Sequence, residues 1–246
     1  FEPRYFHDVG VGCDFVGHPI VSETTANIES VKAFKKMYSL EDEPVILCLP
    51  GSRKSEIDRL MPTFGKTLEK FSNALPGARF ILQSTPDVYE YSKKYLNYMP
   101  KDIIFLTPEK FGIEKYLDFK KVSFKISNLA LAASGTVSLE LAANNTPMVI
   151  GYDLNFLSRQ IIGYMLKTDT VNLVNLITGN RNVPECIGSN FKSEKLFLEM
   201  VKVYSNNRNQ IKDFETTMDL LGNSKEPPNV RAANSLLSFC ENFKTV

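Results

Sequence analysis

The sequence predicts an α/β protein, built as a doubly wound parallel β-sheet and followed by C-terminal helices. Short apolar runs alternate with helical patterns between residues 45 and 176, as in consecutive βαβ units. The first run, 45–49, is continuously apolar, which is typical of a strand covered on both faces. Two of the runs end at glycine-containing turns, 50–53 and 134–136, that lead into helices.

The elements expected along the chain follow from hydrophobic periodicity. After the strand at 45–49, further strands are expected at 79–83, 102–106, 129–133 and 147–152, with a short extended segment at 171–174. Helices are expected within 23–40, after Ser55 (with Asp58 as a capping box), at 87–98, after 136, at 154–166, 193–204, 209–221 and 230–243. Residues 109–126 fit either a helix or a strand.

These elements predict three regions. Residues 1–40 form a linker strand and a helix, 41–190 form the α/β domain, and 191–246 form helices that pack back on it. In such sheets, ligands bind at the carboxyl ends of the strands, where both glycine turns are expected.

Composition excludes several classes of function. The 246 residues include 29 Lys and Arg against 28 Asp and Glu, so no basic surplus supports a nucleic-acid partner. Four scattered cysteines and two histidines do not suit a zinc site or a disulfide framework, and they fit a reducing compartment. No apolar stretch reaches the ~18 residues of a membrane span, and no signal peptide is visible. Because the chain begins with Phe1, we expect a fragment or a processed product.

The first candidate site is the turn after the strand at 45–49. Gly51 would let the backbone approach a ligand closely, and Ser52 and Arg53 precede the positive end of a helix dipole. An arginine there is able to grip phosphate oxygens with two parallel hydrogen bonds. A plain turn with a solvated arginine is an equally good interpretation of this string alone.

The second candidate is the turn containing Ser134, Gly135 and Thr136. Ser134 or Thr136 would cap the following helix, whose free N–H groups bind phosphate. Glu140 lies one helical turn further, where a carboxylate would accept hydrogen bonds from ribose hydroxyls. An ordinary N-cap and a helix-stabilising acid explain the same residues equally well. Together, however, the two turns would surround one nucleotide diphosphate.

Other motifs carry less information. The GxxxxGKS/T string of P-loops is absent, and 10–12 lacks the third glycine of a dinucleotide fingerprint. His18 favours a tight turn in which it donates an N–H, and Asn175 either offers its amide to a ligand or forms a turn. Residues 155–167 favour a core helix over a subunit contact or an interfacial helix, and Asn144–Thr146 is a glycosylation string without a secretory signal.

Several strings, taken together and in this order, resemble the lipid-A-disaccharide synthases, a family of GT-B glycosyltransferases in lipopolysaccharide assembly. They are FVGHP at 15–19, LPGSRKSEI at 49–57, AASGTVSLE at 132–140, TPMV at 146–149, NLI at 175–177 and VPE at 183–185.

The resemblance implies a fold of two Rossmann-like domains facing a cleft, with this chain as the C-terminal, nucleotide-sugar-binding part. It implies transfer from UDP-2,3-diacylglucosamine to 2,3-diacylglucosamine 1-phosphate with release of UDP, and no metal or cofactor. By this resemblance, Ser52 and Arg53 would hold the diphosphate beside Gly51, Arg53 stabilising the leaving group. The 134–136 turn would face phosphate, Glu140 would bind the ribose, and Asn175 would contact the nucleotide.

The resemblance also implies features that this sequence does not contain. In the family, a preceding domain carries a glycine-rich loop, the acceptor surface and the acidic base, so we expect this chain to bind UDP without turnover. Asp153 stands where the family usually has a basic residue. The lipid substrates imply a cytoplasmic enzyme peripheral to the inner membrane, and a homodimer is allowed. Two alternatives stay open: another UDP-GlcNAc-using GT-B transferase or epimerase, and a non-catalytic scaffold module.

Overall fold

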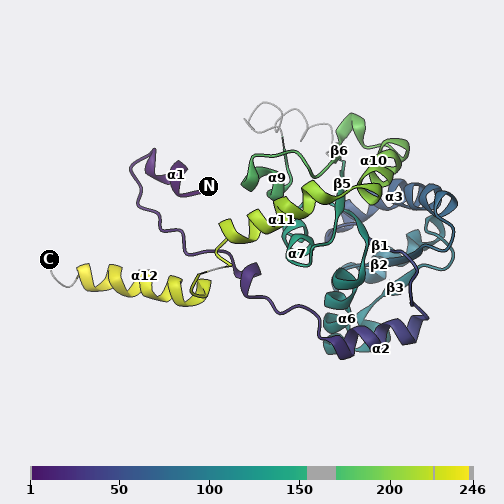
Figure 1. The fold of residues 1–246 in the computed structure, drawn as a ribbon, viewed down its shortest axis with the longest axis horizontal. Coiled ribbons are helices and arrows are strands. Elements are labelled where there is room, and N and C mark those ends of the chain that lie inside the picture. Colours follow the sequence, from purple (N-terminus) through teal and green to yellow (C-terminus); the bar gives the residue numbers. More distant parts are fainter. Residues whose placement is uncertain (1, 154–169, 224, 244–246) are drawn as a thin grey trace.

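The computed structural model describes residues 2–153, 170–223 and 225–243 (Figure 1). Its centre is a six-stranded, all-parallel sheet with the strand order β3-β2-β1-β4-β5-β6. The strands are β1 Val45–Leu49, β2 Arg79–Gln83, β3 Ile104–Leu106, β4 Leu129–Ala132, β5 Met148–Tyr152 and β6 Glu185–Ile187.

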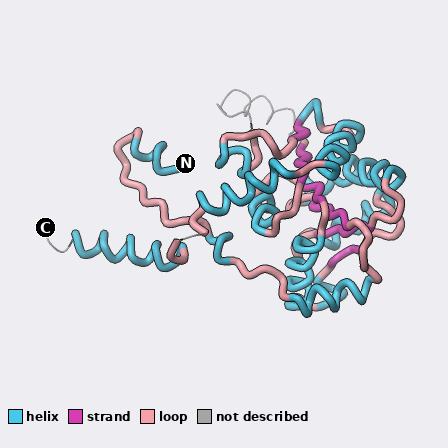
Figure 2. The backbone as a smooth tube through the Cα atoms, in the orientation of Figure 1, coloured by secondary structure: helices cyan, strands magenta, loops and turns pink. Residues whose placement is uncertain are grey.

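Helices make up most of the remaining described chain (Figure 2). They are α1 Glu2–His7, α2 Ile28–Tyr38, α3 Lys54–Ala74, α4 Tyr89–Ser92, α5 Pro108–Phe111, α6 Ile113–Ile126, α7 Val137–Ala143, α9 Leu173–Thr178, α10 Ser193–Ser205, α11 Arg208–Leu220 and α12 Pro228–Phe243. Three short 3₁₀ helices are η1 Pro19–Ser22, η2 Lys93–Tyr98 and η3 Gly188–Asn190.

Each face of the sheet has its own apolar core, because successive side chains of a strand point to opposite faces. Leu47 lies in the core formed with α6, α7, α9 and α11, where Phe119 and Phe214 are fully buried. Its neighbour Cys48 lies in the core formed with α3 and α10, around Phe64. Helices therefore cover both faces, which confirms the doubly wound α/β fold.

The chain changes direction across the sheet between β1 and β4. From β1 it runs outward to β2 and β3, and it then returns to the other side of β1 as β4. Leu47 pairs with Ile81 of β2 on one side and with Ala130 of β4 on the other. The connections that leave the carboxyl ends of β1 and β4 consequently diverge, and this divergence opens a crevice in doubly wound sheets.

Most expected elements are present, but two expectations are wrong and one strand was not expected. The 171–174 segment is not an extended strand, because α9 begins at Leu173 and the Asn172 side chain caps it by accepting the Asn175 N–H at 3.1 Å. The strand β6 was not expected. The start of α3 is capped by Glu56 rather than by Ser55 and Asp58. Residues 109–126 form most of α5 and all of α6, while the helix expected at 154–166 lies outside the described residues.

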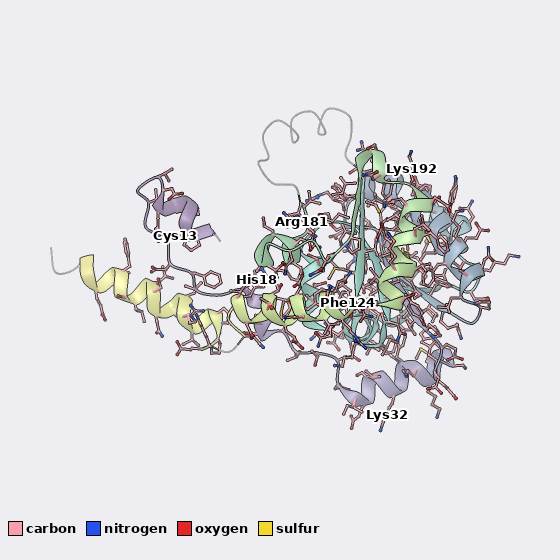
Figure 3. The ribbon with its side chains drawn as sticks, turned by 45° about the horizontal axis from the view of Figure 1, so that its top comes forward. Cys13, His18, Lys32, Phe124, Arg181 and Lys192 are labelled. Carbon is pink, nitrogen blue, oxygen red and sulfur yellow. The ribbon has the colours of Figure 1, made fainter. Side chains whose placement is uncertain are left out.

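The two ends of the chain also differ from expectation. No strand precedes β1 among the described residues, so the expectation of a linker strand within 1–40 is wrong. Helices α10 and α11 pack on the sheet domain, but α12 extends away from it beside the N-terminal segment (Figures 1 and 3). Leu236, Leu237 and Phe239 of α12 are each more than half exposed. The domain boundaries stay a prediction.

The N-terminal segment and α12 are joined by specific contacts. The Arg231 guanidinium donates to the Phe15 carbonyl and the Ser235 hydroxyl to Asp14, both at 2.7 Å. At Gly17, which has a φ of +95°, a Cβ would lie 3.1 Å from the Leu221 carbonyl oxygen, so this crossing favours glycine. The FVGHP motif at 15–19 is therefore the place where the N-terminal segment contacts the chain between α11 and α12. Its histidine accepts, through Nδ1, a hydrogen bond from the Ile20 N–H, and this replaces the donor role that we expected.

Candidate functional site

A cavity of about 390 Å³ lies at the carboxyl ends of β1, β2 and β4, where the chain reverses direction across the sheet. The turn after β1 forms one wall, and the turn after β4 with the first part of α7 forms the opposite wall. Seven of the eight candidate residues line it, namely Gly51, Ser52, Arg53, Ser134, Gly135, Thr136 and Glu140. The eighth, Asn175, does not.

The first wall is organised by a residue that the sequence analysis did not single out. Glu56 lies in the first turn of α3, and its Oε2 accepts hydrogen bonds from the Ser52 and Arg53 N–H groups at 2.8 and 3.2 Å. Its Oε1 receives the Arg53 guanidinium at 3.0 Å. The Arg53 side chain remains 75% exposed, so much of its hydrogen-bonding edge faces solvent at the cavity.

The second wall is formed by the turn before α7. The Ser134 hydroxyl donates to the Val171 carbonyl at 3.0 Å, which ties this turn to the segment that enters α9. Gly135 has a φ of +152°. Thr136 precedes α7 without a capping hydrogen bond from its side chain, so the expectation that Ser134 or Thr136 caps this helix is wrong. Both side chains nevertheless stay at the cavity lining.

Glu140 forms an ion pair that the sequence did not reveal. Its Oε1 lies 3.1 Å from the Lys120 ammonium, and the two side chains are 25% and 29% exposed. Lys120 comes from α6 and also lines the cavity. One turn earlier in α6, burial and then the Glu140 charge raise the pKa of Tyr116 to about 12, so this phenol stays protonated and donates to the Ser84 carbonyl.

Two polar side chains at the end of β2 form the floor. Gln83 is buried and accepts a hydrogen bond from the Ser123 hydroxyl of α6 at 3.0 Å. The Thr85 hydroxyl is buried and has no hydrogen-bond partner among the described residues. The cavity therefore combines a largely exposed arginine and a partly buried lysine, each paired with a glutamate, with polar groups at the end of β2, an arrangement suited to a polar ligand.

Asn175 has a structural place instead of a place in the cavity. It is fully buried, and its amide donates to the Val183 carbonyl at 2.8 Å and to Glu185 at 3.1 Å. Its side-chain oxygen accepts the Val183 N–H at 3.1 Å. These bonds use the amide to join α9 to the segment entering β6, which corrects the expectation that Asn175 contacts a nucleotide.

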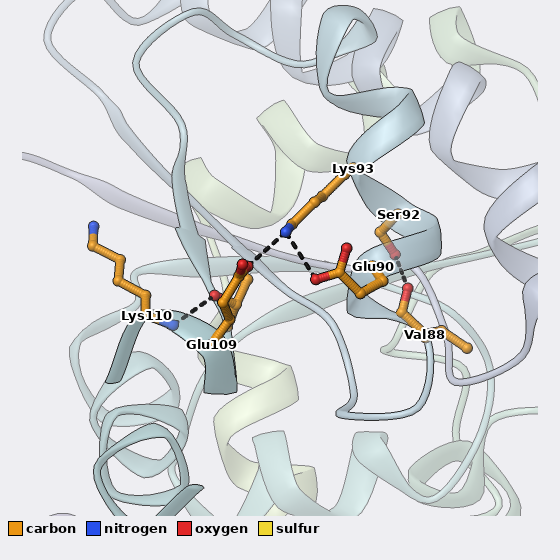
Figure 4. A network of polar contacts seen from close by, with 7 residues as sticks. Val88, Glu90, Ser92, Lys93, Glu109 and Lys110 are labelled. Carbon is orange, nitrogen blue, oxygen red and sulfur yellow. Dashed lines mark hydrogen bonds and ion pairs between the residues drawn. The ribbon is translucent and has the colours of Figure 1, made fainter. Parts of the chain in front are cut away.

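The helices that follow β2 and β3 are held together by charged contacts (Figure 4). Lys93 contacts Glu90 at 2.8 Å and Glu109 at 2.5 Å, and so joins the helices that follow β2 and β3. Next to them, Asp58 of α3 accepts hydrogen bonds from the hydroxyls of Tyr91 and Tyr95. These contacts fix the segments that follow the strands relative to α3.

Two classes of feature are not found in the described part of the chain. No group of three or more His, Cys, Asp or Glu residues there is arranged to hold a metal ion. None of the helices in 2–153, 170–223 and 225–243 combines the length and apolar character required to cross a bilayer.

The fold defines the class of protein, a doubly wound α/β unit, and solved glycosyltransferases share this fold. A glycosyltransferase from Rickettsia africae superposes with a TM-score of 0.54 at 13% identity, over 92% of this chain and 54% of that chain. The E. coli ADP-heptose lps heptosyltransferase II superposes with a TM-score of 0.53 at 12% identity, over 75% of this chain and 54% of that one. Identities this low show the fold alone.

The family follows from sequence. Residues 1–237 match the lipid-A-disaccharide synthetase family, and the chain belongs to this family. The lipid-A-disaccharide synthase of Ruegeria pomeroyi is 39% identical over 96% of this chain, and that of Rhodospirillum centenum is 34% identical over 97%. The chain spans only 59% and 58% of the lengths of these two relatives.

Proposed function

We propose that this chain is the donor-binding part of a lipid-A-disaccharide synthase, with the nucleotide diphosphate of its donor held in the cavity between the two turns. The observation that carries the proposal is that the Gly51–Arg53 and Ser134–Glu140 segments, far apart in the sequence, line one cavity at the switch point of the sheet. The proposed donor is UDP-2,3-diacylglucosamine, and the proposed acceptor is 2,3-diacylglucosamine 1-phosphate.

Arg53 is the residue proposed to stabilise the leaving group. When the glycosidic bond to UDP breaks, negative charge develops on the diphosphate, and a cation placed there in advance lowers the barrier. The exposed edge of the Arg53 guanidinium would donate two parallel hydrogen bonds to phosphate oxygens. Lys120, across the same cavity, would add a second positive charge. This chemistry uses protein groups and needs no metal or other cofactor.

Glu140 is proposed to bind the ribose. Lys120 holds its Oε1, and within the described residues its Oε2 accepts no hydrogen bond. A ribose hydroxyl would donate to that oxygen. The Ser134–Thr136 turn would then lie against the phosphates, with Gly51 and Ser52 on the opposite wall.

The rest of the reaction is proposed to need groups beyond the 59% of the R. pomeroyi enzyme that this chain spans. By family resemblance, the acceptor surface and the acidic base belong to a preceding domain, so this chain would bind UDP without transferring sugar. Both substrates are lipids, so the proposal places the assembled enzyme at the inner face of the cytoplasmic membrane. A homodimer is compatible with the proposal.

Titration calorimetry with UDP tests the proposal. We expect the chain to bind UDP, and we expect Arg53→Ala and Glu140→Ala each to weaken binding by about 1.5–3 kcal/mol, because each removes a hydrogen bond that involves a charged group. Arg208→Ala is the matched control, since this exposed arginine begins α11 at the opposite end of the sheet, near Gln210 and its hydrogen bonds to Met148. Unchanged affinity in both cavity variants would refute the proposal.

Two further measurements separate the alternatives. Competition between acylated and plain UDP-sugars distinguishes a lipid A enzyme from another UDP-GlcNAc-using transferase or epimerase, with tighter binding of the acylated donor expected. An assay with both lipid substrates is expected to give no disaccharide from this chain alone. Product formation would contradict the proposed division of labour between this chain and a preceding domain.

A further inference from the structure

Glu56 is a charged side chain held almost out of solvent at the edge of the cavity. Its side chain is 10% exposed. It accepts hydrogen bonds from the Ser52 and Arg53 N–H groups, from the Arg53 guanidinium at 3.0 Å and from the Tyr152 hydroxyl at 3.3 Å. A buried carboxylate needs such partners, since an unpaired charge there would be strongly unfavourable.

These contacts lie in the turn that precedes α3, which begins at Lys54. Backbone N–H groups where a strand turns into a helix are able to bind an external anion such as phosphate. Here the Glu56 carboxylate accepts the N–H groups of Ser52 and Arg53, the two residues before the helix, so these two donors are already used and a negative charge lies beside them. The diphosphate of a bound nucleotide would therefore meet the side chain of Arg53 rather than these backbone groups.

The conformation of Gly51 is matched to the position of Glu56. Gly51 has a φ of +106°, and a Cβ built on it would lie 2.3 Å from the Glu56 Oε2 atom, much closer than real contacts allow. Only glycine permits both the backbone angle and the approach of the carboxylate. The glycine of this turn is thus explained by Glu56, with no need for a ligand at that point.

Glu56 also connects the turn to a different strand. Tyr152 ends β5, and its hydroxyl donates to the same oxygen that receives the Arg53 guanidinium. Burial and then the Glu56 charge raise the pKa of Tyr152, so the phenol keeps the proton that it donates. The carboxylate therefore fixes Arg53 from one side and is itself fixed from β5.

We infer that Glu56 is a positioning residue for the nucleotide diphosphate: it occupies the Ser52 and Arg53 N–H groups and holds the Arg53 guanidinium at the cavity, so that the phosphates bind through the arginine side chain. This inference rests on the proposed function, in which the cavity binds UDP. It differs from that proposal because Glu56 would touch no ligand and would act only through Arg53.

The test compares UDP with uridine, which lacks the phosphates that Arg53 would contact. Glu56→Ala is expected to weaken UDP binding about tenfold and to change uridine binding less than twofold, because only the phosphate contact depends on the fixed guanidinium. Glu56→Gln keeps one of the two acceptor oxygens and is expected to restore part of the loss. In an Arg53→Ala background, Glu56→Ala is expected to change UDP affinity less than twofold, since coupled residues are not additive.

Two further variants serve as a control and as an independent test of the contact to Glu56. Glu69→Gln changes an exposed glutamate of the same helix and is expected to leave UDP binding unchanged. Tyr152→Phe removes one contact to Glu56 without removing a buried charge, and it is expected to weaken UDP binding two- to threefold even if Glu56→Ala does not fold.

Three results would overturn the inference. These are UDP affinity in the Glu56 and Tyr152 variants that equals or exceeds that of the unmodified chain, equal losses for UDP and uridine, and fully additive losses with Arg53→Ala. If the unmodified chain fails to bind UDP, the proposed function itself is refuted, and this result is distinct from all three.

Discussion

We expect Asn175→Ala to destabilise the folded chain while leaving its affinity for UDP unchanged. The Asn175 amide is fully buried and makes three hydrogen bonds, two with the backbone of Val183 and one with Glu185. Alanine would leave the Val183 N–H and carbonyl groups buried without these partners. Glu185 would keep its hydrogen bonds from the Thr170 hydroxyl and the Val171 N–H.

The magnitude follows from the two orphaned backbone groups. An unsatisfied buried donor or acceptor costs about 1–3 kcal/mol, so the pair should lower the free energy of unfolding by about 2–6 kcal/mol. For a chain of this length, each 1 kcal/mol shifts Tm by about 2–4 °C, so the midpoint should fall by about 4–24 °C. Urea and thermal unfolding followed by circular dichroism measure both quantities.

The control is Asn190→Ala, which truncates an exposed asparagine and should change stability by less than about 0.5 kcal/mol. The reasoning is refuted if Asn175→Ala unfolds like the unmodified chain. It is also refuted if the variant stays equally stable and loses UDP affinity as Arg53→Ala does, because that result would make Asn175 a ligand contact.

Two further predictions concern charged groups. Lys120→Met should weaken UDP binding by about 1 kcal/mol at low ionic strength and by less in high salt, because salt screens the attraction between the lysine and the phosphates. Calorimetry in both buffers measures this difference. Equal affinities of the variant and the unmodified chain at low salt would contradict it. Hydrogen bonds, first from Tyr95, hold the pKa of Asp58 below its ordinary value, so the folded state binds this proton less readily than the unfolded chain. The stability that Asp58 provides is present above about pH 4 and is lost as the pH falls through its lowered pKa, so urea midpoints of Asp58→Asn should fall less between pH 6 and 3 than those of the unmodified chain.

The central strands could be predicted because they are buried on both faces. The bounds of β1 and β2 agree with the apolar runs at 45–49 and 79–83, since every second residue faces one of two helix layers. Strand β6 has only three residues and includes a glutamate, so it left no comparable run. The segment at 171–174 was predicted to be extended because its valines favour a strand. The Asn172 side chain instead caps a helix that begins at the next residue.

The sequence predicted those residues of the candidate site that directly follow the ends of β1 and β4. Both turns were identified in this way, but the order of the strands is what places them on one cavity. Glu56 was missed although it stands at the third position of α3, where a glutamate commonly caps its own helix. Lys120 left no signal, because it is 20 residues from Glu140 in the sequence and the two side chains meet only in the folded chain.

The contacts at Gly17 couple the N-terminal segment to α12, so that the two are expected to move together. Arg231 and Ser235 bind the backbone and side chain of residues 14–15, and Gly17 fits beneath the turn that leads into α12. A displacement of the last helix would therefore pull the N-terminal segment with it, and the force would reach the sheet domain through η1 and the end of α11. A force on α12 or on the N-terminal segment would therefore act on the same side of the domain, where η1 contacts α7 and α7 packs against α9.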